Sequence, residues 1–216
     1  SITTSLSYIK ADSAWADDYT GEGRLICSFD TGVEGTHDAL SDSWKGKDGD
    51  SSAAWFDPIF DLPAPHTQGA GYIPLNHGTH VMGIMVGRDT AAGYTVGVAP
   101  NARWISACVI DVGSTVILRA FEWAADPDGN PNTVEDVPDV INHSWGFDRE
   151  GTYSWEIDCQ NIVFDAIDYT EALGIVNIFA AGNEGDYGEL TIANPANRAN
   201  DSLDCFAVGA LNSNLS

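Results

Sequence analysis

Apolar segments of strand length alternate along this chain with segments of helical period. Residues 24–33 are typical of a buried strand that ends in a carboxylate, Asp30, and a turn glycine. Further strands are expected at residues 104–110, 139–142, 175–185 (with its turn) and 205–211, and helices at residues 8–19, 77–86, 114–125 and 156–173. Because strands and helices alternate and no repeat or linker divides the chain, the sequence predicts an α/β fold in a single domain over residues 1–216. Its core is expected to be a doubly wound, mainly parallel sheet with helices on both faces.

The predicted sheet is incomplete at its C-terminal end. The last expected strand, residues 205–211, is apolar, and nothing follows it that would cover its helix-facing side. An exposed apolar edge of this kind favours association with further chain. We therefore expect the fold to depend on an additional segment.

Two histidines, His77 and His80, begin an apolar run whose length and period favour a buried helix. His77 falls in its first turn, where a histidine has room to work as a general base. The alternatives are a pair of polar residues at the edge of a core helix, or a metal pair on one helix face. Gly78 and Gly83 are poor helix formers, so their presence indicates that something large approaches this helix.

Two other polar residues follow predicted strands directly. Asp30 ends the strand at residues 24–33, and Asn183 lies in the turn after the strand that begins at residue 175. In open α/β sheets, ligands bind at the carboxyl ends of the strands. The sequence thus predicts a site that brings together Asp30, His77 and Asn183.

The order of these three residues, in the contexts Asp-Thr-Gly, His-Gly-Thr-His and Ala-Ala-Gly-Asn-Glu-Gly, resembles the subtilisin-like serine proteases. Further matches lie at residues 97–100, 140–146 and 206–210. The resemblance implies peptide hydrolysis by a serine, histidine and aspartate triad, with His77 as the base, Asp30 orienting it and the Asn183 amide donating to the oxyanion. A dinucleotide-binding alternative at residues 32–35 lacks the required glycine spacing.

One element of the family pattern is missing. The nucleophile of the family lies in a Gly-Thr-Ser-Met-Ala type motif well after the asparagine turn, and the 216 residues do not contain one. The resemblance implies that a second chain or a C-terminal segment carries the serine, and that this chain alone is nearly inactive. The alternative is a non-catalytic peptide-binding or regulatory protein of the same fold, which would have no chemical need of all three site residues.

The resemblance also implies where a polypeptide substrate binds. The residues expected to hold an extended peptide by strand addition, together with the loop around Gly113, are Ser144, Trp145 and Gly146. One wall of the pocket for the side chain before the cut bond is assigned to Ala180, Ala181 and Gly182. For Trp145 a core position is the alternative.

Acidic residues outnumber basic ones, with 32 Asp and Glu against 9 Lys and Arg, so the formal net charge is −23. Such a chain repels nucleic acid, and no apolar run reaches the roughly 18 residues of a membrane span. We expect neither nucleic acid nor a membrane as a partner. The acidity and a start without signal-peptide features are typical of a mature, secreted protein.

Two acidic turns, residues 48–50 and 126–130, offer the oxygen ligands that calcium prefers. In the second turn Gly129 is at the fourth position, whereas a calcium-binding hand needs glycine at the sixth, so polar turns are the simpler interpretation. Structural Ca²⁺ is common in proteins that the chain resembles, although Ala39 stands where many of them have an aspartate ligand. We expect that catalysis requires no cofactor, and leave structural Ca²⁺ open without assigning a metal ligand.

Four cysteines permit three pairings. Cys159 and Cys205 lie in polar surroundings and are predicted to form a disulfide, as suits a secreted chain. Cys27 and Cys108 lie within apolar strands and are predicted to remain buried thiols.

Overall fold

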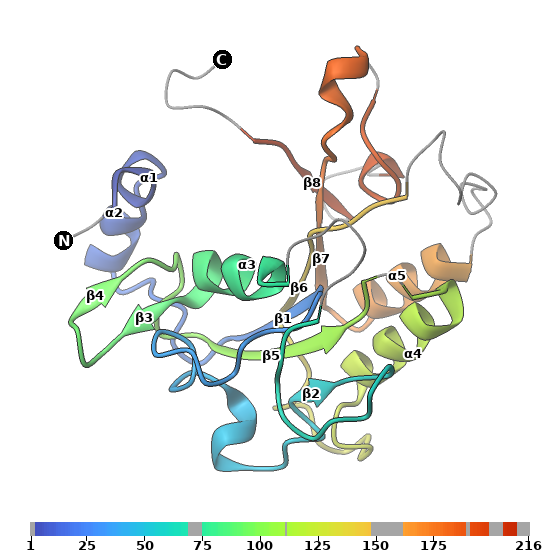
Figure 1. Ribbon diagram of the computed structural model, residues 1–216, viewed down its shortest axis with the longest axis horizontal. Coiled ribbons are helices and arrows are strands. Elements are labelled where there is room, and N and C mark those ends of the chain that lie inside the picture. The colour runs from blue at the N-terminus through green and yellow to red at the C-terminus, as the bar shows by residue number, and fades with distance from the viewer. Residues whose placement is uncertain are drawn as a thin grey trace.

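The computed structural model describes residues 3–68, 75–110, 112–147, 162–188, 191–198 and 205–210. Within these ranges six parallel strands form one sheet in the order β2-β5-β1-β6-β7-β8 (Figure 1). In that order the strands are Trp55–Phe56, Arg103–Cys108, Leu25–Asp30, Val140–His143, Val176–Ala180 and Phe206–Val208. A small antiparallel pair is formed by β3 (Arg88–Asp89) and β4 (Tyr94–Thr95). The predicted parallel α/β sheet is confirmed.

Helices lie on both faces of this sheet (Figure 1). One face is covered by α3 (His77–Val86), and the other by α4 (Ser114–Ala125) and α5 (Ile162–Ala172), which contact each other. The remaining helices are α1 (Thr4–Tyr8), α2 (Ala11–Ala16) and the 3₁₀ helices η1 (Lys45–Asp48), η3 (Glu184–Tyr187) and η4 (Ala196–Arg198). None of the helices in the described residues is long and apolar enough to cross a membrane.

The central strand β1 contributes side chains to two separate hydrophobic clusters, because successive side chains of a strand point to opposite faces of the sheet. Its odd-numbered residues Leu25, Cys27 and Phe29 belong to the cluster under α4 and α5. Ile26 belongs to the other cluster, with Met82 of α3. Each fully buried side chain of this size contributes about 2 kcal/mol relative to an exposed one, so β1 is anchored from both sides.

Several predicted boundaries differ from the structure. The single helix expected at residues 8–19 is wrong: α1 and α2 are separated at Lys10, whose backbone is left-handed with φ 60°. The helix at residues 114–125 is confirmed. Of the helix expected at residues 156–173, the described part is Ile162–Ala172.

Three of the four cysteines lie in described residues. Cys27 and Cys108 are buried thiols, as predicted, and burial raises the pKa of both. The buried Sγ of Cys205 lies 3.3 Å from the carbonyl oxygen of Pro195. Cys159 lies outside the described residues, so its pairing with Cys205 stays a prediction.

A buried histidine connects β6 and β7 to α5. His143, at the end of β6, is fully buried and stacks on Phe179 of β7 with ring centroids 4.1 Å apart. Its Nε2 lies 3.0 Å from Oδ1 of Asn177, whose Nδ2 donates to the Thr170 hydroxyl at 3.0 Å. Burial lowers the pKa of His143 to about 3, and the Asn177 hydrogen bond opposes this only in part.

This pKa makes the stability of the fold sensitive to mild acid. Below pH 6.5 the unfolded chain binds a proton at His143, whereas the folded chain does not bind it until about pH 3. The contribution of His143 to the free energy of unfolding is thus complete above pH 6.5 and is lost as the pH falls toward 3. At about pH 5 the loss is about 2 kcal/mol. Urea unfolding of the wild type at about pH 7.5 and about pH 5 checks this value.

The matched variants are His143→Gln, which removes the buried imidazole, and His80→Gln, which removes an exposed one. The first variant should be less stable at neutral pH but should lose less stability on acidification. The second should follow the wild type. Equal pH dependence in all three proteins would contradict the assignment to His143.

Candidate active site

The strand β1 and the helix α3 meet at a carboxylate and an imidazole. Asp30 is the last residue of β1 and fully buried, and His77 is the first residue of α3 with its side chain 33% exposed. The His77 Nδ1 lies 2.7 Å from Oδ1 of Asp30, which also accepts the Thr31 N–H at 2.7 Å. Because a carboxylate accepts, Nδ1 is the donor, and Nε2 of the neutral ring keeps its lone pair.

The same contact sets the basicity of the imidazole. The hydrogen bond to Asp30 is the main cause that raises the pKa of His77 above 6.5, and the Asp30 charge adds to it, while partial burial opposes both. Neutral imidazole with an accepting Nε2 is the form that removes a proton from a hydroxyl. The pair is therefore equipped for general-base chemistry.

Two threonine hydroxyls hold the start of α3 against the turn after β1. The Gly78 N–H donates to Oγ1 of Thr31 at 3.0 Å, and the Glu34 N–H donates to Oγ1 of Thr79 at 2.8 Å. Sequence reasoning did not assign a role to either threonine. Their positions in the sequence could have indicated these roles, since Thr31 follows Asp30 directly and Thr79 lies between the two histidines.

The close approach of α3 to the end of β1 explains why Gly78, one of the two glycines of α3, has no side chain. A Cβ on Gly78 would lie 2.3 Å from the carbonyl oxygen of Gly32 and 3.0 Å from Cβ of Asp30. Gly32 itself has φ +88°, and a Cβ there would lie 2.1 Å from the carbonyl oxygen of His66. For Gly83 the expectation was wrong within the described residues, because nothing lies within 4 Å of its added Cβ.

Asn183 lies at the same edge of the sheet as Asp30. The register pairs Phe29 with His143 and His143 with Phe179, so β1, β6 and β7 end side by side. Asn183 follows β7 in an exposed position directly before η3, and its side chain makes no capping bond there. The two contacting residues of the predicted site are thus Asp30 and His77, and Asn183 lies two strands away.

The stretch Ser144–Gly146, which is expected to hold a peptide by strand addition, is not itself part of a strand, because β6 ends at His143. The backbone turns away to pair with another segment: the Phe147 N–H donates to the carbonyl oxygen of Asn194 at 2.7 Å. Trp145 is half-buried with ring contacts to His143, Phe147 and Phe179, so it packs partly on the core.

The two predicted substrate-binding stretches approach the same residue. The Ala193 N–H donates to the carbonyl oxygen of Ala181 at 3.0 Å. An added Cβ would come within 3.0 Å of the Ala193 methyl group from Gly146, and within 3.1 Å from Gly182. Gly182 has φ +102°, and half-buried Ala180 is the last residue of β7. Residues 144–146 and 180–182 are therefore linked through Ala193.

A metal pair on α3 is not supported. His80 is exposed, and the His77 Nδ1 is engaged by Asp30. A groove of about 880 Å³ between α4 and α5 is also separate from this site, since its lining includes Pro138 and Ile175, just before β6 and β7. That groove opens at the amino edge of the sheet, whereas Asp30 ends at the carboxyl edge.

A sequence model of the subtilase family matches residues 21–216. The chain belongs to the subtilase family. Its homologues in this family are serine peptidases. The resemblance to subtilisin-like proteases that the motifs indicated is confirmed.

Three subtilases illustrate the degree of similarity. Bacillopeptidase F of Bacillus subtilis is 35% identical, over 99% of this chain and 15% of that protein. Subtilisin E of Bacillus subtilis is 29% identical, over 99% of this chain and 47% of the relative. Minor extracellular protease Vpr, also of Bacillus subtilis, is 30% identical, over 95% of this chain and 23% of the relative. The chain thus spans less than half the length of each of the three.

In this subtilase the close approach of α3 to the end of β1 can be tested by substituting alanine for each of two glycines of α3, Gly78 and Gly83. Gly78→Ala should destabilise the fold by about 2 kcal/mol, because the added methyl group meets backbone that cannot move freely. Gly83→Ala should leave stability unchanged or raise it by up to about 1 kcal/mol, because alanine favours helix and the space is open. Urea unfolding of both variants provides the measurement. Equal effects of the two substitutions would contradict the close approach at Gly78.

Proposed function

We propose that this chain is the part of a secreted serine endopeptidase that supplies the base, its orienting carboxylate and an oxyanion donor. The observation that carries the proposal is the 2.7 Å hydrogen bond between His77 Nδ1 and buried Asp30, at the carboxyl edge of a parallel sheet. Membership of the subtilase family supports the reaction class.

Each group has a defined task in peptide hydrolysis. The serine hydroxyl attacks the scissile carbonyl carbon, and Nε2 of His77 takes its proton as the new C–O bond forms. Asp30 holds Nδ1–H and stabilises the imidazolium, which then gives the proton to the leaving amine. Water releases the acyl group by the same steps. The Asn183 amide donates to the carbonyl oxygen as negative charge develops there.

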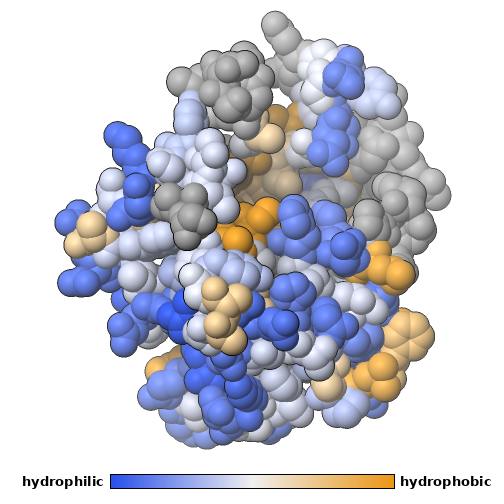
Figure 2. Space-filling view, turned by 60° about the vertical axis from the view of Figure 1, so that its left-hand side comes forward, coloured by the Kyte–Doolittle hydropathy of each residue, from blue (hydrophilic) through white to orange (hydrophobic). Residues whose placement is uncertain are grey.

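The serine is proposed to come from a further segment, either a separate chain or a C-terminal part of the same protein. Support comes from apolar surface that such a segment would cover. On β8, an edge strand of the described sheet, Phe206 is 38% exposed and Val208 is 55% exposed. Ile84 of α3 is 51% exposed. In the view of Figure 2, apolar side chains are visible in a recess of a largely hydrophilic surface.

The substrate is proposed to be an extended polypeptide. The stretches Ser144–Gly146 and Ala180–Gly182 leave adjacent parallel strands at the edge that also carries Asp30, which supports a shared substrate site. Because the Ala181 backbone is already paired with Val208 and Ala193, strand addition by the peptide is assigned to the backbone of Ser144–Gly146. No cofactor has a role in this mechanism.

Secretion is proposed for two reasons. One similar subtilase, Vpr, is described by its name as extracellular. The net charge of −23 keeps a protein soluble in a cation-containing medium.

Replacement of the base provides the first test of this function. In the protein purified with its serine segment, kcat/KM for a chromogenic peptide should rise with pH as His77 loses its proton. The midpoint should lie above pH 6.5, because Asp30 raises the pKa of His77. His77→Ala should lower kcat by about 10⁶-fold, a size known from subtilisin rather than obtained from this protein. His80→Ala, on the same helix, should retain activity. Equal rates for wild type and His77→Ala would favour a peptide-binding function instead.

The oxyanion role of Asn183 is tested separately. Asn183→Ala should lower kcat by roughly 100- to 1,000-fold, again the subtilisin magnitude, with little change in KM. The reason is that this amide meets charge that exists only in the transition state. Asn197→Ala, at an exposed asparagine within the 3₁₀ helix η4, is the matched control. A change confined to KM would exclude the proposed role.

A further inference from the structure

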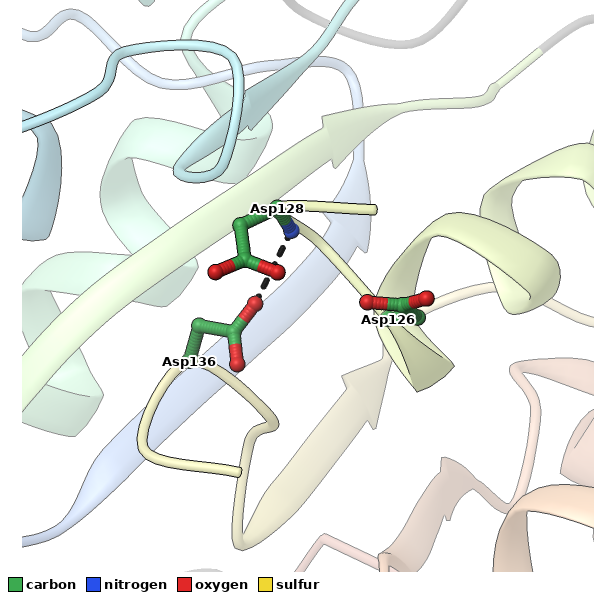
Figure 3. Close-up of side chains that lie close together, drawn as sticks. All are labelled: Asp126, Asp128 and Asp136. Atoms are coloured by element: carbon green, nitrogen blue, oxygen red, sulfur yellow. Dashed lines mark hydrogen bonds between the residues drawn. The ribbon is translucent and has the colours of Figure 1, made fainter. Parts of the chain in front are cut away.

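Three aspartates gather in the connection between α4 and β6 (Figure 3). Asp126 follows α4 directly as its C-terminal cap residue, Asp128 lies in the next turn, and Asp136 precedes β6. One carboxylate oxygen from each lies within 4.8 Å of the others. Figure 3 shows Asp126 facing the other two across a common space. This cluster is at the amino edge of the sheet, away from Asp30 and His77.

The negative charge of Asp136, the buried aspartate of the cluster, is not balanced by a positive group among the described residues. Asp136 is only 4% exposed, and its Oδ2 accepts the Asp128 N–H at 2.9 Å. Its Oδ1 is buried with no hydrogen-bond partner among the described residues, and the same is true of Oδ1 of Asp126. A buried carboxylate oxygen without a donor or cation is costly, so such an atom points to a missing positive partner.

The chain itself supplies no such partner in the described residues. The ion pairs found there involve none of the three aspartates. Lys45 contacts the same loop, but its described hydrogen bond goes to the carbonyl oxygen of Glu135. Asp126 also lies at the C-terminal end of α4, where the helix dipole adds negative potential. The three carboxylates and the negative end of the α4 dipole repel one another, and the net charge of −23 adds to this repulsion.

We propose that Asp126, Asp128 and Asp136 bind a divalent cation, and that this cation is calcium. The donor atoms are all carboxylate oxygens, which hard cations prefer, and the cluster contains no thiolate or imidazole of the kind that zinc takes. Oxygen separations of up to 4.8 Å are within the reach of calcium, whose bonds of about 2.3–2.6 Å form in flexible geometry. Magnesium needs a near-ideal octahedron and usually keeps several waters, so calcium suits three carboxylates of one loop better.

The sequence pattern alone had favoured a polar turn here, because Gly129 is at the wrong position for a calcium-binding hand. The structure supplies what the local motif lacks, since Asp136 comes from the far end of the loop. A cation bound there ties the end of α4 to the start of β6. It therefore stabilises the connection between a covering helix and the sheet, and takes no part in peptide hydrolysis.

Calorimetric titration with CaCl₂ tests the site in the full protein after treatment with EDTA. The wild type should bind calcium, and saturation should raise Tm by about 5 °C at 100 times Kd. Asp128→Asn and Asp136→Asn should each lose one calcium equivalent or weaken its binding at least about tenfold, because each removes a ligand charge. Asp128 is exposed, so its variant decides the question even if Asp136→Asn fails to fold.

Asp12→Asn is the matched control, because it removes the same charge from an exposed position of α2 outside both acidic turns. It should bind calcium like the wild type. Calcium stoichiometry and affinity in Asp128→Asn equal to those of the wild type would overturn the site, and so would the absence of binding at millimolar CaCl₂. Equal or tighter binding of MgCl₂ would overturn the choice of calcium.

Discussion

The hydrogen bond between the Asp30 carboxylate and the His77 imidazole determines how the sheet and α3 meet. Asp30 is fully buried, so its charge needs donors. The imidazole and the Thr31 N–H supply them at Oδ1, whereas Oδ2 has no hydrogen-bond partner among the described residues. The helix can come this close only because Gly78 has no side chain. The imidazole is thereby positioned by the packing of the core and not by a loop. Such support is what the proposed base needs, since a catalytic group must be held within about 0.5 Å of its working geometry.

The other buried aspartates of the described residues have different partners to stabilise their negative charge. Asp57 accepts backbone N–H groups at three positions and lies 3.6 Å from His66. Asp89 accepts one N–H, from Ala92. Asp136 accepts one N–H and has two further carboxylates as neighbours. Its environment is therefore the least balanced of the set, which is why a cation is the natural complement.

Local pattern and chain order were sufficient to predict the parallel sheet, the position of His77 in a first turn and the placement of Asp30 and Asn183 after strands. These features depend on periodicity and on strand ends, which the sequence displays directly. Features that depend on contacts distant in sequence were missed. The role of Thr31 depends on Gly78, and the importance of Asp136 depends on its meeting Asp126. The pairing of the backbone after β6 with residues 193–194 was also missed, because it joins segments that are distant in sequence.

The central position of β1 has a consequence for how the molecule opens. Its amides are held by β5 on one side and β6 on the other, and its side chains reach both hydrophobic clusters. Exchange of these amide protons with solvent therefore requires nearly global unfolding, whereas β8, held by β7 alone among the described strands, opens at lower free energy. Any protease cleaves a folded chain first at the segments that open first. The Asp30 carboxylate, which is hydrogen-bonded to His77, lies in a strand that opens last.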